Sequence, residues 1–474
     1  MKRMPTCAVA LTLLLSSLLV FAAPEEGQPP PRIVLKEKVV SLARPEGAYL
    51  IPGGTEFSRD CGRVAYALAE GDRRWIVVDG QAGPVYDHVR APRFSYDSTS
   101  LAYRARKGEE WYAVIDAKEQ GPYTDIVVWP PFAWHSSRAA YGVAKEGKQL
   151  MVVRAKEGPE YDEIHGPELS PDDSRIVYWG RRGDSWFSII DGEETPAGDL
   201  FGDVHFSPDS ERCLHVERRW RGFFSPKMQG FVLMDGDRFG PYFAGPAAVR
   251  FSLDSKHYLF VARSWKTRKW QVVTDGKEEA TDFEFRTPLV TLSPDWNRVA
   301  YYVTVAGLES IVLDGNLLKA CEDMPFSLVF SPDSTRTAHV EVIGGKHYVV
   351  VDGEHEGPYD HICDDAQFSP DSRHVAYQAG KDGEEFVVVD GRAGPRYEEA
   401  SRGLSFSPDS AHVAYAAKKG GEWLIVVDGV EGKVRLSEVR RGPVFESPTR
   451  LKLAGVREPG PEFVRLEVEI EAAP

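Results

Sequence analysis

The sequence predicts an all-β protein made of about eleven copies of one four-stranded unit. Three observations lead to this prediction. The segments FSPDSRHVAY (368–377) and FSPDSAHVAY (406–415) differ at a single position. Relatives of this segment recur along the chain at a period of about 38 residues, with no helical periodicity between them. The 33 prolines and 43 glycines also disfavour a helical repeat of similar length.

Each copy begins with an aromatic residue or leucine that is followed three positions later by Asp. This first position is occupied by Phe57, Phe94, Phe132, Leu169, Phe206, Phe251, Leu292, Phe330, Phe368 and Phe406. The Asp is present in nine of the ten copies, and His135 replaces it in the other. A second landmark, VVDG or a relative of it, follows 22 residues after the first position in eight copies. The even spacing indicates that the copies adjoin one another without a linker.

The copy at 366–400 illustrates how each unit divides into four strands. AQFS ends at Pro-Asp-Ser, where Pro fixes φ and Asp can bond its own backbone, so a tight turn is expected. RHVAYQA alternates apolar and polar residues, and EEFVVVDG is an apolar run that ends in Asp-Gly, a strong hairpin signal. GPRYEEA then leads to the next copy. Four strands in about 38 residues, repeated along the chain, are typical of β-propeller blades.

The two ends of the array complement each other. FESPTRLKLAGV (445–456) and EFVRLEVEIE (462–471) supply the first three strands of an eleventh unit, whereas RIVLKEKVV (32–40) and GAYLI (47–51) resemble late strands. We expect the termini to complete one shared blade, because this removes exposed sheet edges. Eleven blades exceed the usual four to eight, so we expect two rings with a changeover near 236–250; one wide ring is the alternative.

The N-terminal residues predict secretion. Lys2 and Arg3 precede the apolar run AVALTLLLSSLLVFAA (8–23), which is shorter than a membrane span and ends in small residues. We therefore divide the chain into a signal peptide (1–23), a Pro-rich linker (24–31) and the propeller array (32–471), and expect a secreted or periplasmic protein without a later transmembrane segment. Removal of Lys2 and Arg3 leaves 55 basic against 72 acidic residues, which disfavours nucleic acid as a partner.

The segment FSPDSRHVAYQAGKDGEEFVVVDG (368–391) resembles the WD40-like propeller repeat of TolB-type proteins and of the propellers of prolyl-oligopeptidase-type peptidases. The likeness covers nearly the whole mature chain. It implies a propeller scaffold, often extracytoplasmic, that binds proteins or gates another domain. The separate α/β domain of TolB-type proteins and the hydrolase domain of the peptidases have no counterpart in this sequence, and no G-x-S-x-G motif is present. The resemblance therefore implies no activity.

Two further sequence patterns are interpreted as structural. Most of HEGPYDHICDD (355–365) follows the repeat template, although His355, His361, Cys363 and Asp365 could share one strand face and bind a metal. The tyrosine of G-P-Y or G-P-x-Y recurs in six units, and we expect it to pack between blades with its hydroxyl bonded to backbone. No metal or other cofactor is expected.

The best candidate site is where the repeat departs from its template. Units five and six lengthen their second hairpin to ERRWRGFFSPKMQG (217–230) and RSWKTRKW (263–270). The residues expected to contact a partner are Arg218, Arg219, Trp220, Arg221, Phe223, Phe224, Lys227, Arg263, Trp265, Lys266, Arg268, Lys269 and Trp270. Cations and aromatics gathered on one rim favour a docking site for a protein or an anionic ligand, although a drifted loop remains the alternative.

We therefore predict a non-catalytic scaffold that binds a protein or ligand through these loops. The first alternative is an enzyme with an active site in the central channel, which the expected apolar character of the inner strands disfavours. The second is an accessory subunit of a separately encoded hydrolase.

Overall fold

The structure, a computed structural model, describes most of residues 33–472. Within this span it does not describe residues 44–47, 91, 130–131, 133–137, 198–203, 222–226, 235–236, 244–245, 247, 282–289, 306, 319–327 and 460–461. At residues 43, 218–221, 227–228, 280–281 and 401–402 it describes the backbone alone. The expected signal peptide (1–23) and linker (24–31) lie outside the described residues. The described residues form no helix, and so none that could cross a membrane.

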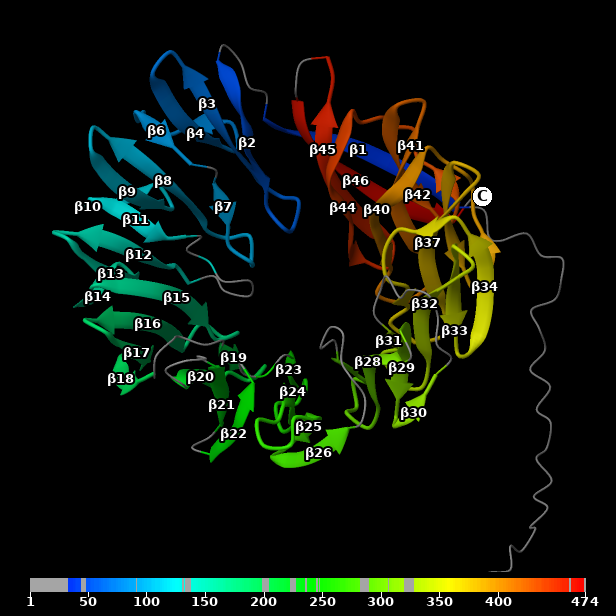
Figure 1. Cartoon of the computed structure of the whole chain (residues 1–474). Helices are drawn as coiled ribbons and strands as arrows, with labels where there is room; N and C mark the ends of the chain where they lie inside the picture. Colours follow the sequence, from blue (N-terminus) through cyan, green and yellow to red (C-terminus); the bar gives the residue numbers. More distant parts are fainter. Residues whose placement is uncertain are drawn as a thin grey trace, which may run out of the picture.

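The strands form eleven antiparallel sheets, which we number as blades one to eleven (Figure 1). Blade one contains β2 (Tyr49–Phe57), β3 (Val64–Glu70), β4 (Arg73–Val78) and β5 (Gln81–Ala82). Blade two contains β6 (His88–Val89), β7 (Arg93–Phe94), β8 (Leu101–Lys107), β9 (Glu110–Ile115) and β10 (Lys118–Tyr123). Blade three contains β11 (Asp125–Val128), β12 (Ala140–Lys145), β13 (Lys148–Val153) and β14 (Lys156–Tyr161). Blade four contains β15 (Glu163–Leu169), β16 (Ile176–Arg182), β17 (Ser185–Ile190) and β18 (Glu193–Pro196).

The remaining complete units repeat this arrangement. Blade five contains β19 (Val204–Phe206), β20 (Cys213–Arg221), β21 (Lys227–Met234) and β22 (Asp237–Phe243), and blade six contains β23 (Ala248–Phe251), β24 (Tyr258–Arg263), β25 (Trp270–Thr274) and β26 (Lys277–Thr281). Blade seven contains β27 (Val290–Leu292), β28 (Val299–Val305), β29 (Leu308–Leu313) and β30 (Asn316–Leu317), and blade eight contains β31 (Val329–Phe330), β32 (Thr337–Ile343), β33 (Lys346–Val351) and β34 (Glu354–Tyr359). Blade nine contains β35 (His361–Ile362), β36 (Gln367–Phe368), β37 (Val375–Lys381), β38 (Glu384–Val389) and β39 (Arg392–Ala393). Blade ten contains β40 (Glu399–Phe406), β41 (Val413–Lys419), β42 (Glu422–Val427) and β43 (Val430–Glu431).

Blade eleven is built from both ends of the array, as the sequence predicted. β44 (Glu438–Ser447), β45 (Arg450–Arg457) and β46 (Glu462–Ala472) form its first three strands, and β1 (Ile33–Ala43) pairs with β46 as the fourth. The antiparallel register starts at Ile33↔Ala472 and covers almost the whole of both strands. The assignment of residues 47–51 to a late strand is wrong, because they enter β2, the first strand of blade one.

The blades form one ring around a central opening (Figure 1). The structure contains eleven buried apolar clusters, and each joins two consecutive blades. One of them closes the ring, because Phe57 and Tyr66 of blade one pack with Phe463 of blade eleven. The expectation of two rings is therefore wrong. At the expected changeover, Tyr242 of blade five and Val249 of blade six share a cluster like that of any other neighbouring pair.

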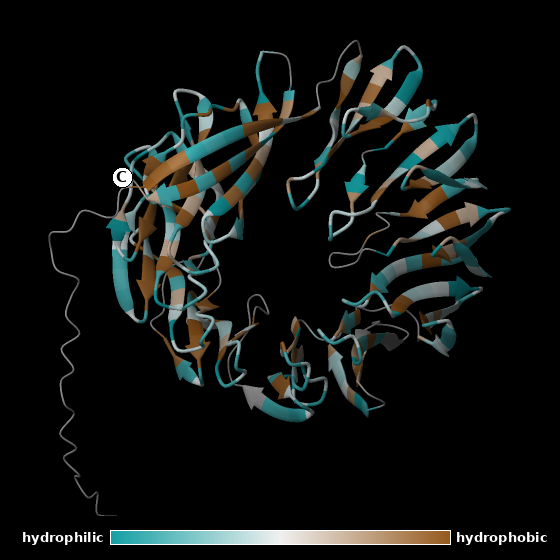
Figure 2. Cartoon of the chain, turned by 180° about the vertical axis from the view of Figure 1, so that it is seen from behind, coloured by the Kyte–Doolittle hydropathy of each residue, from teal (hydrophilic) through white to brown (hydrophobic). Residues whose placement is uncertain are grey.

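The blades are apolar on both faces because each is covered by two neighbours. In β38 (Glu384–Val389) the consecutive residues Phe386, Val387 and Val388 are all buried. A strand buried on both faces has a continuous apolar run in place of alternation, which explains VVVDG and its relatives. Figure 2 shows this distribution, with hydrophobic segments along the strands and hydrophilic residues concentrated in the loops.

Asp-Gly closes the hairpin between the third and fourth strands. Asp390 and Gly391 both have positive φ, 48° and 73°, as a two-residue type I′ turn requires. The Asp390 carboxylate also accepts a hydrogen bond from the Val375 amide at 3.0 Å. Because blade strands are antiparallel, the Ser-Pro-Asp and Asp-Gly turns share one rim, which we call the turn rim. The hairpins between the second and third strands lie on the opposite rim, which we call the hairpin rim.

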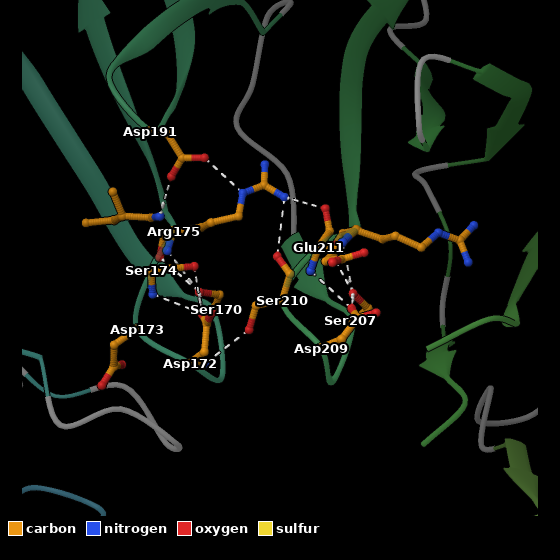
Figure 3. Close-up of polar contacts among 12 residues, drawn as sticks. Ser170, Asp172, Asp173, Ser174, Arg175, Asp191, Ser207, Asp209, Ser210 and Glu211 are labelled. Atoms are coloured by element: carbon orange, nitrogen blue, oxygen red, sulfur yellow. Dashed lines mark hydrogen bonds and ion pairs between the residues drawn. The ribbon is translucent and has the colours of Figure 1, made fainter. Parts of the chain in front are cut away.

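The Ser-Pro-Asp-Ser motif forms a turn and also joins neighbouring blades (Figure 3). Ser170 Oγ donates to Asp172 Oδ1 at 2.8 Å within the turn of blade four. The Asp172 amide donates to Ser210 Oγ of blade five at 3.0 Å. The same bond between blades recurs at five further interfaces. The structural interpretation of the repeated Asp is therefore confirmed, and the second Ser of the motif has the role of acceptor for the preceding blade.

An arginine on the turn rim provides a second bond between blades. The Arg175 side chain donates to Asp191 of its own blade at 2.9 Å and to the Glu211 carbonyl of blade five at 2.8 Å (Figure 3). Its guanidinium also lies 5.5 Å from the centroid of the Phe206 ring of blade five. Arg63, Arg298 and Arg336 make equivalent contacts, whereas His257, His374 and His412 occupy this position in blades six, nine and ten.

The G-P-x-Y tyrosines pack between blades, as predicted, but the expected backbone partner of the hydroxyl is wrong. Tyr86 is buried and donates to the Glu119 carboxylate of the next blade at 2.7 Å. Tyr161 and Tyr242 make the same bond to Glu194 and Glu278. Burial and the carboxylate acceptor hold the pKa of Tyr86 well above its usual range, so this hydroxyl stays a donor.

Candidate functional site

The hairpin of blade five is longer than its counterparts. β20 and β21 have nine and eight residues, whereas the equivalent strands of blade four have seven and six. The pairing continues to Arg221↔Lys227, so the extra length is added at the hairpin rim. Of the residues expected to contact a partner here, Arg218, Arg219, Trp220, Arg221 and Lys227 lie in the paired strands, and Phe223 and Phe224 lie outside the described residues.

The hairpin of blade six is closed by a compact loop. The Ser264 amide donates to the Lys269 carbonyl at 2.9 Å, and the Arg268 amide donates to the Ser264 carbonyl at 3.0 Å. Arg263 Nε donates to the Arg268 carbonyl at 2.8 Å, so this cation braces the loop from the preceding strand. The loop therefore holds its side chains on a defined backbone.

The loop packs against an aromatic residue of blade five that the sequence interpretation missed. The ring centroids of Trp265 and Phe243 are 4.5 Å apart, with an interplanar angle of 31°. The Arg268 guanidinium lies 4.4 Å from the centroid of the Phe243 ring and 5.5 Å from that of Trp265. A cation and two aromatic rings thus form one stacked group across the blade boundary.

Phe243 departs from the repeat template in a way that explains this group. At the equivalent position of four other units an acidic residue accepts a hydrogen bond from the hairpin backbone of the next blade; these residues are Asp87, Asp162, Asp360 and Glu398. Phe243 cannot accept such a bond, and the Trp265 indole stacks on it instead. The sequence contains this difference: Phe follows the tyrosine in GPYF (240–243), whereas Glu follows the tyrosine in GPRYE (394–398).

The two departing hairpins lie side by side on the hairpin rim. Arg219 pairs with Gln229, and Gln229 pairs with Phe243, so these positions form one row across blade five. The Trp265 amide donates to the Pro241 carbonyl at 3.0 Å, which joins the blade-six loop to the outer strand of blade five. The fold therefore brings together the two basic segments that the sequence places 46 positions apart, from Arg219 to Trp265.

The side chains of the blade-six segment differ in exposure. Lys266, Arg268 and Lys269 are exposed, and Trp265 is half-buried against Phe243. Trp270 instead packs on the apolar cluster between blades six and seven. The assignment of Trp270 to the contact surface is therefore wrong, because it lies in β25 among core residues rather than in the loop.

The residues considered as metal ligands separate into two groups. His361, Cys363 and Glu385 place one ligand atom each within 4.8 Å of one another, whereas His355 bonds Glu341 at 2.9 Å. Burial raises the pKa of the Cys363 thiol to about 11, which disfavours the thiolate that binds metals. Glu385 Oε2 accepts a hydrogen bond from the Ala400 amide at 2.7 Å, so one of its oxygens already has a structural role.

The inner wall of the ring is more polar than the sequence interpretation expected. The residue directly before the first aromatic position faces out of the core in several blades, and it is Arg93, Glu168 and Arg250 in blades two, four and six. The expectation of mostly apolar inner strands is wrong, because the burial pattern alternates there and the apolar residues face the neighbouring blades.

Comparisons with known proteins show likeness at the level of structure. No protein-family model matches the chain, and no curated protein sequence matches it. A solved structure of a eukaryotic initiation factor has 13% identity and a TM-score of 0.40, covering 68% of this chain and 90% of that one. The β-propeller domain of the Trilobed protease from Pyrococcus furiosus has 13% identity and a TM-score of 0.28, covering 65% and 97%. TolB from Acinetobacter baumannii has 14% identity and a TM-score of 0.23, covering 54% and 75%.

The eleven blades, nine with four strands and two in which the first strand is divided into two, define the class of this chain, which is a β-propeller protein.

Proposed function

We propose that the chain is a secreted or periplasmic, non-catalytic scaffold that binds an acidic protein through the hairpin rim of blades five and six. The surface consists of Phe243, Trp265, Lys266, Arg268 and Lys269 together with the adjoining blade-five hairpin, and we call it the basic–aromatic surface. The observation that carries the proposal is the stacked group of Phe243, Trp265 and Arg268, which replaces the acid-to-backbone bond of other interfaces.

The charge of this surface supports an acidic partner. The chain has a net charge of −15, yet its lengthened hairpins are basic. Among the described residues, no carboxylate lies within 4 Å of the side-chain nitrogens of Lys266 or Arg268. Both positive charges are therefore available to a partner. Aromatic residues and arginine are the side chains that most often dominate the binding energy of protein interfaces.

Secretion and the absence of catalysis rest on the sequence. The basic start and apolar run of residues 1–23 support export, and no recognised catalytic motif supports an enzyme. The alternatives are an enzyme with its active site in the channel and an accessory subunit of a separate hydrolase.

A photo-crosslinking amino acid at position 266 tests the proposal in the organism that makes the protein. We expect adducts with one acidic protein from position 266 and none from position 184, an exposed residue in the hairpin of blade four. Adducts of equal yield from both positions, or none from position 266, contradict the proposal. An adduct with a basic protein would contradict the proposal that the partner is acidic.

A matched pair of charge variants distinguishes specific binding at this surface from a general effect of net charge. The reversal Lys266→Glu, Arg268→Glu, Lys269→Glu should abolish the adduct formed from a probe at position 267, an exposed residue of the same loop. The control reversal Lys118→Glu, Lys156→Glu, Arg392→Glu changes the net charge equally at exposed positions beside Asp-Gly-type turns on the turn rim. If the control weakens the adduct as much, the surface has no specific role.

A further inference from the structure

A second candidate site lies on the inner wall, where the two ends of the array meet. A pocket of about 720 Å³ opens there, lined by residues of blades eleven, one, two and three. The lining residues are Thr55, Glu56, Phe57, Arg59, Arg93, Phe94, Ser95, Tyr96, Phe132, Arg440 and Arg441. The strands that supply most of them, β2, β7 and β44, border the central opening (Figure 1). Its size is in the range of pockets that bind small molecules.

The pocket is strongly cationic in an acidic protein. Its lining contains the four arginines Arg59, Arg93, Arg440 and Arg441, and all four are exposed. Glu56 is the one carboxylate among the lining residues, and Arg440 also forms an ion pair at 2.8 Å with Glu438 outside the lining, so two of the four positive charges stay unbalanced. Among the described residues, no carboxylate lies within 4 Å of Arg59 or Arg441.

Glu56 interacts with two of these cations. Arg93 lies 3.5 Å from its carboxylate, and Arg441 also acts on it electrostatically. Burial raises the pKa of Glu56 above its usual range, and the two arginines oppose this rise. A half-buried carboxylate beside two cations holds them near one another, and both arginine side chains stay exposed.

Aromatic side chains complete the site. The Arg59 guanidinium lies 4.0 Å from the centroid of the Tyr96 ring, which fixes this cation over a flat surface. Phe132 is buried at the pocket wall. The pocket thus combines fixed guanidinium groups, which suit carboxylate or phosphate oxygens, with apolar area for a carbon skeleton.

We infer that this pocket binds a small organic polyanion, a molecule with two or more carboxylate or phosphate groups on a compact carbon skeleton. The three arginines without a short ion pair to a second carboxylate come from three blades, Arg59 from blade one, Arg93 from blade two and Arg441 from blade eleven, so a ligand with more than one anionic group can engage several of them. The site is independent of the basic–aromatic surface, which lies on blades five and six, so either proposal can fail alone.

Titration calorimetry with two probes tests the inference and identifies the anionic group. Citrate tests carboxylates and fructose 1,6-bisphosphate tests phosphates; binding of either supports the site, and binding of neither overturns it. The double variant Arg93→Gln, Arg441→Gln should weaken binding by about ten-fold or more, because two charge-assisted hydrogen-bonding groups are lost. The control is Arg250→Gln, since Arg250 is the exposed counterpart of Arg93 in blade six and should leave affinity unchanged.

A measurement on the unaltered protein removes any doubt from misfolded variants. Phenylglyoxal modifies accessible arginines, and peptide mass spectrometry reports the extent at each position. The bound probe should protect Arg59, Arg93 and Arg441 while Arg250 stays reactive. Equal protection of Arg250, or none at the pocket arginines, contradicts the site.

Discussion

The Trp265 ring lies 4.5 Å from the Phe243 ring, centroid to centroid, and this contact joins blades six and five at the hairpin rim. At the equivalent position of four other units the template provides an acid that binds the hairpin backbone, for example Asp162 bound to Gly183 at 2.7 Å. The replacement of a polar contact by a partly exposed aromatic stack is what distinguishes this interface. It also gives the first prediction.

Replacing Trp265 by Ala should weaken partner binding by about ten-fold or more, since aromatic anchors of this kind contribute about 2 kcal/mol at interfaces. The free energy of unfolding should fall by less than about 1 kcal/mol, because Trp265 is partly exposed in a loop. The partner found by crosslinking and urea unfolding supply the two measurements. Trp296→Ala is the control, because Trp296 lies in the Ser-Pro-Asp turn of blade seven on the opposite rim. Equal loss of binding in both variants would show that the indole at 265 has no special role.

The interface between blades nine and ten should gain stability from His374→Arg. Where other blades place Arg, His374 bonds its own Asp390 at 2.7 Å and leaves a pocket of about 750 Å³ that is also lined by Phe406 and Ala411. Arginine there should stack on Phe406 and donate to the Ala411 carbonyl, raising the free energy of unfolding by about 1 kcal/mol.

The reciprocal variant Arg336→His tests the same contact in the other direction. It removes the bond to the Arg373 carbonyl at 2.6 Å and the stack on Phe368, so stability should fall by about 1 kcal/mol. Guanidinium chloride unfolding of both variants supplies the values. A shift of both variants in the same direction would refute the account of the arginine bond.

The free energy of unfolding should fall in acid, in part because the Glu341 carboxylate becomes protonated. Its buried carboxylate bonds His339 at 3.1 Å and His355 at 2.9 Å. Burial alone raises the pKa of Glu341, but the bonds to the two histidines outweigh it and hold the pKa below the usual 4.5. A lowered pKa means that this stabilisation is complete above the unfolded value and is lost as pH falls through the folded value.

Urea midpoints measured from about pH 7 down to about pH 3 check this dependence. The decline of stability in acid should be smaller in Glu341→Gln than in the unaltered chain, since the amide does not titrate. Glu422→Gln provides the control at an exposed position. If the urea midpoints of the unaltered chain and of Glu341→Gln decline equally in acid, Glu341 does not contribute to the pH dependence of stability.

The blades could be predicted from the sequence because a few consecutive residues determine each of their turns, hairpins and strands. Ser-Pro-Asp sets a turn, Asp-Gly sets a hairpin, and the apolar run VVVDG sets a strand buried on both faces. The shared eleventh blade was predictable because the strands missing at one end were present at the other. The number of rings was not, because ring closure depends on the small angle between neighbouring blades, which no single repeat encodes.

The candidate sites were less predictable because they depend on contacts between units. The hairpins of blades five and six differ from the other repeats in the sequence itself. The role of Phe243 could not be predicted, because the sequence does not show that the acidic residue at this position in other units binds the hairpin of the next blade. Trp270 was assigned to the loop because one strand boundary decides whether it faces the rim or the core. The arginine pocket joins Arg93 to Arg441, and only closure of the ring brings positions so distant in the chain together.

Closure of the ring through β1 and β46 is the central claim, and a designed disulfide tests it most directly. Lys38 and Glu467 are paired in register, and their side chains form an ion pair at 3.2 Å. In Lys38→Cys, Glu467→Cys, oxidation should produce a disulfide within the monomer and raise the midpoint of unfolding, since it closes a very long loop. The mismatched pair Lys38→Cys, Glu471→Cys should not form one. Failure of the matched pair, or equal oxidation of both pairs, would contradict the shared blade.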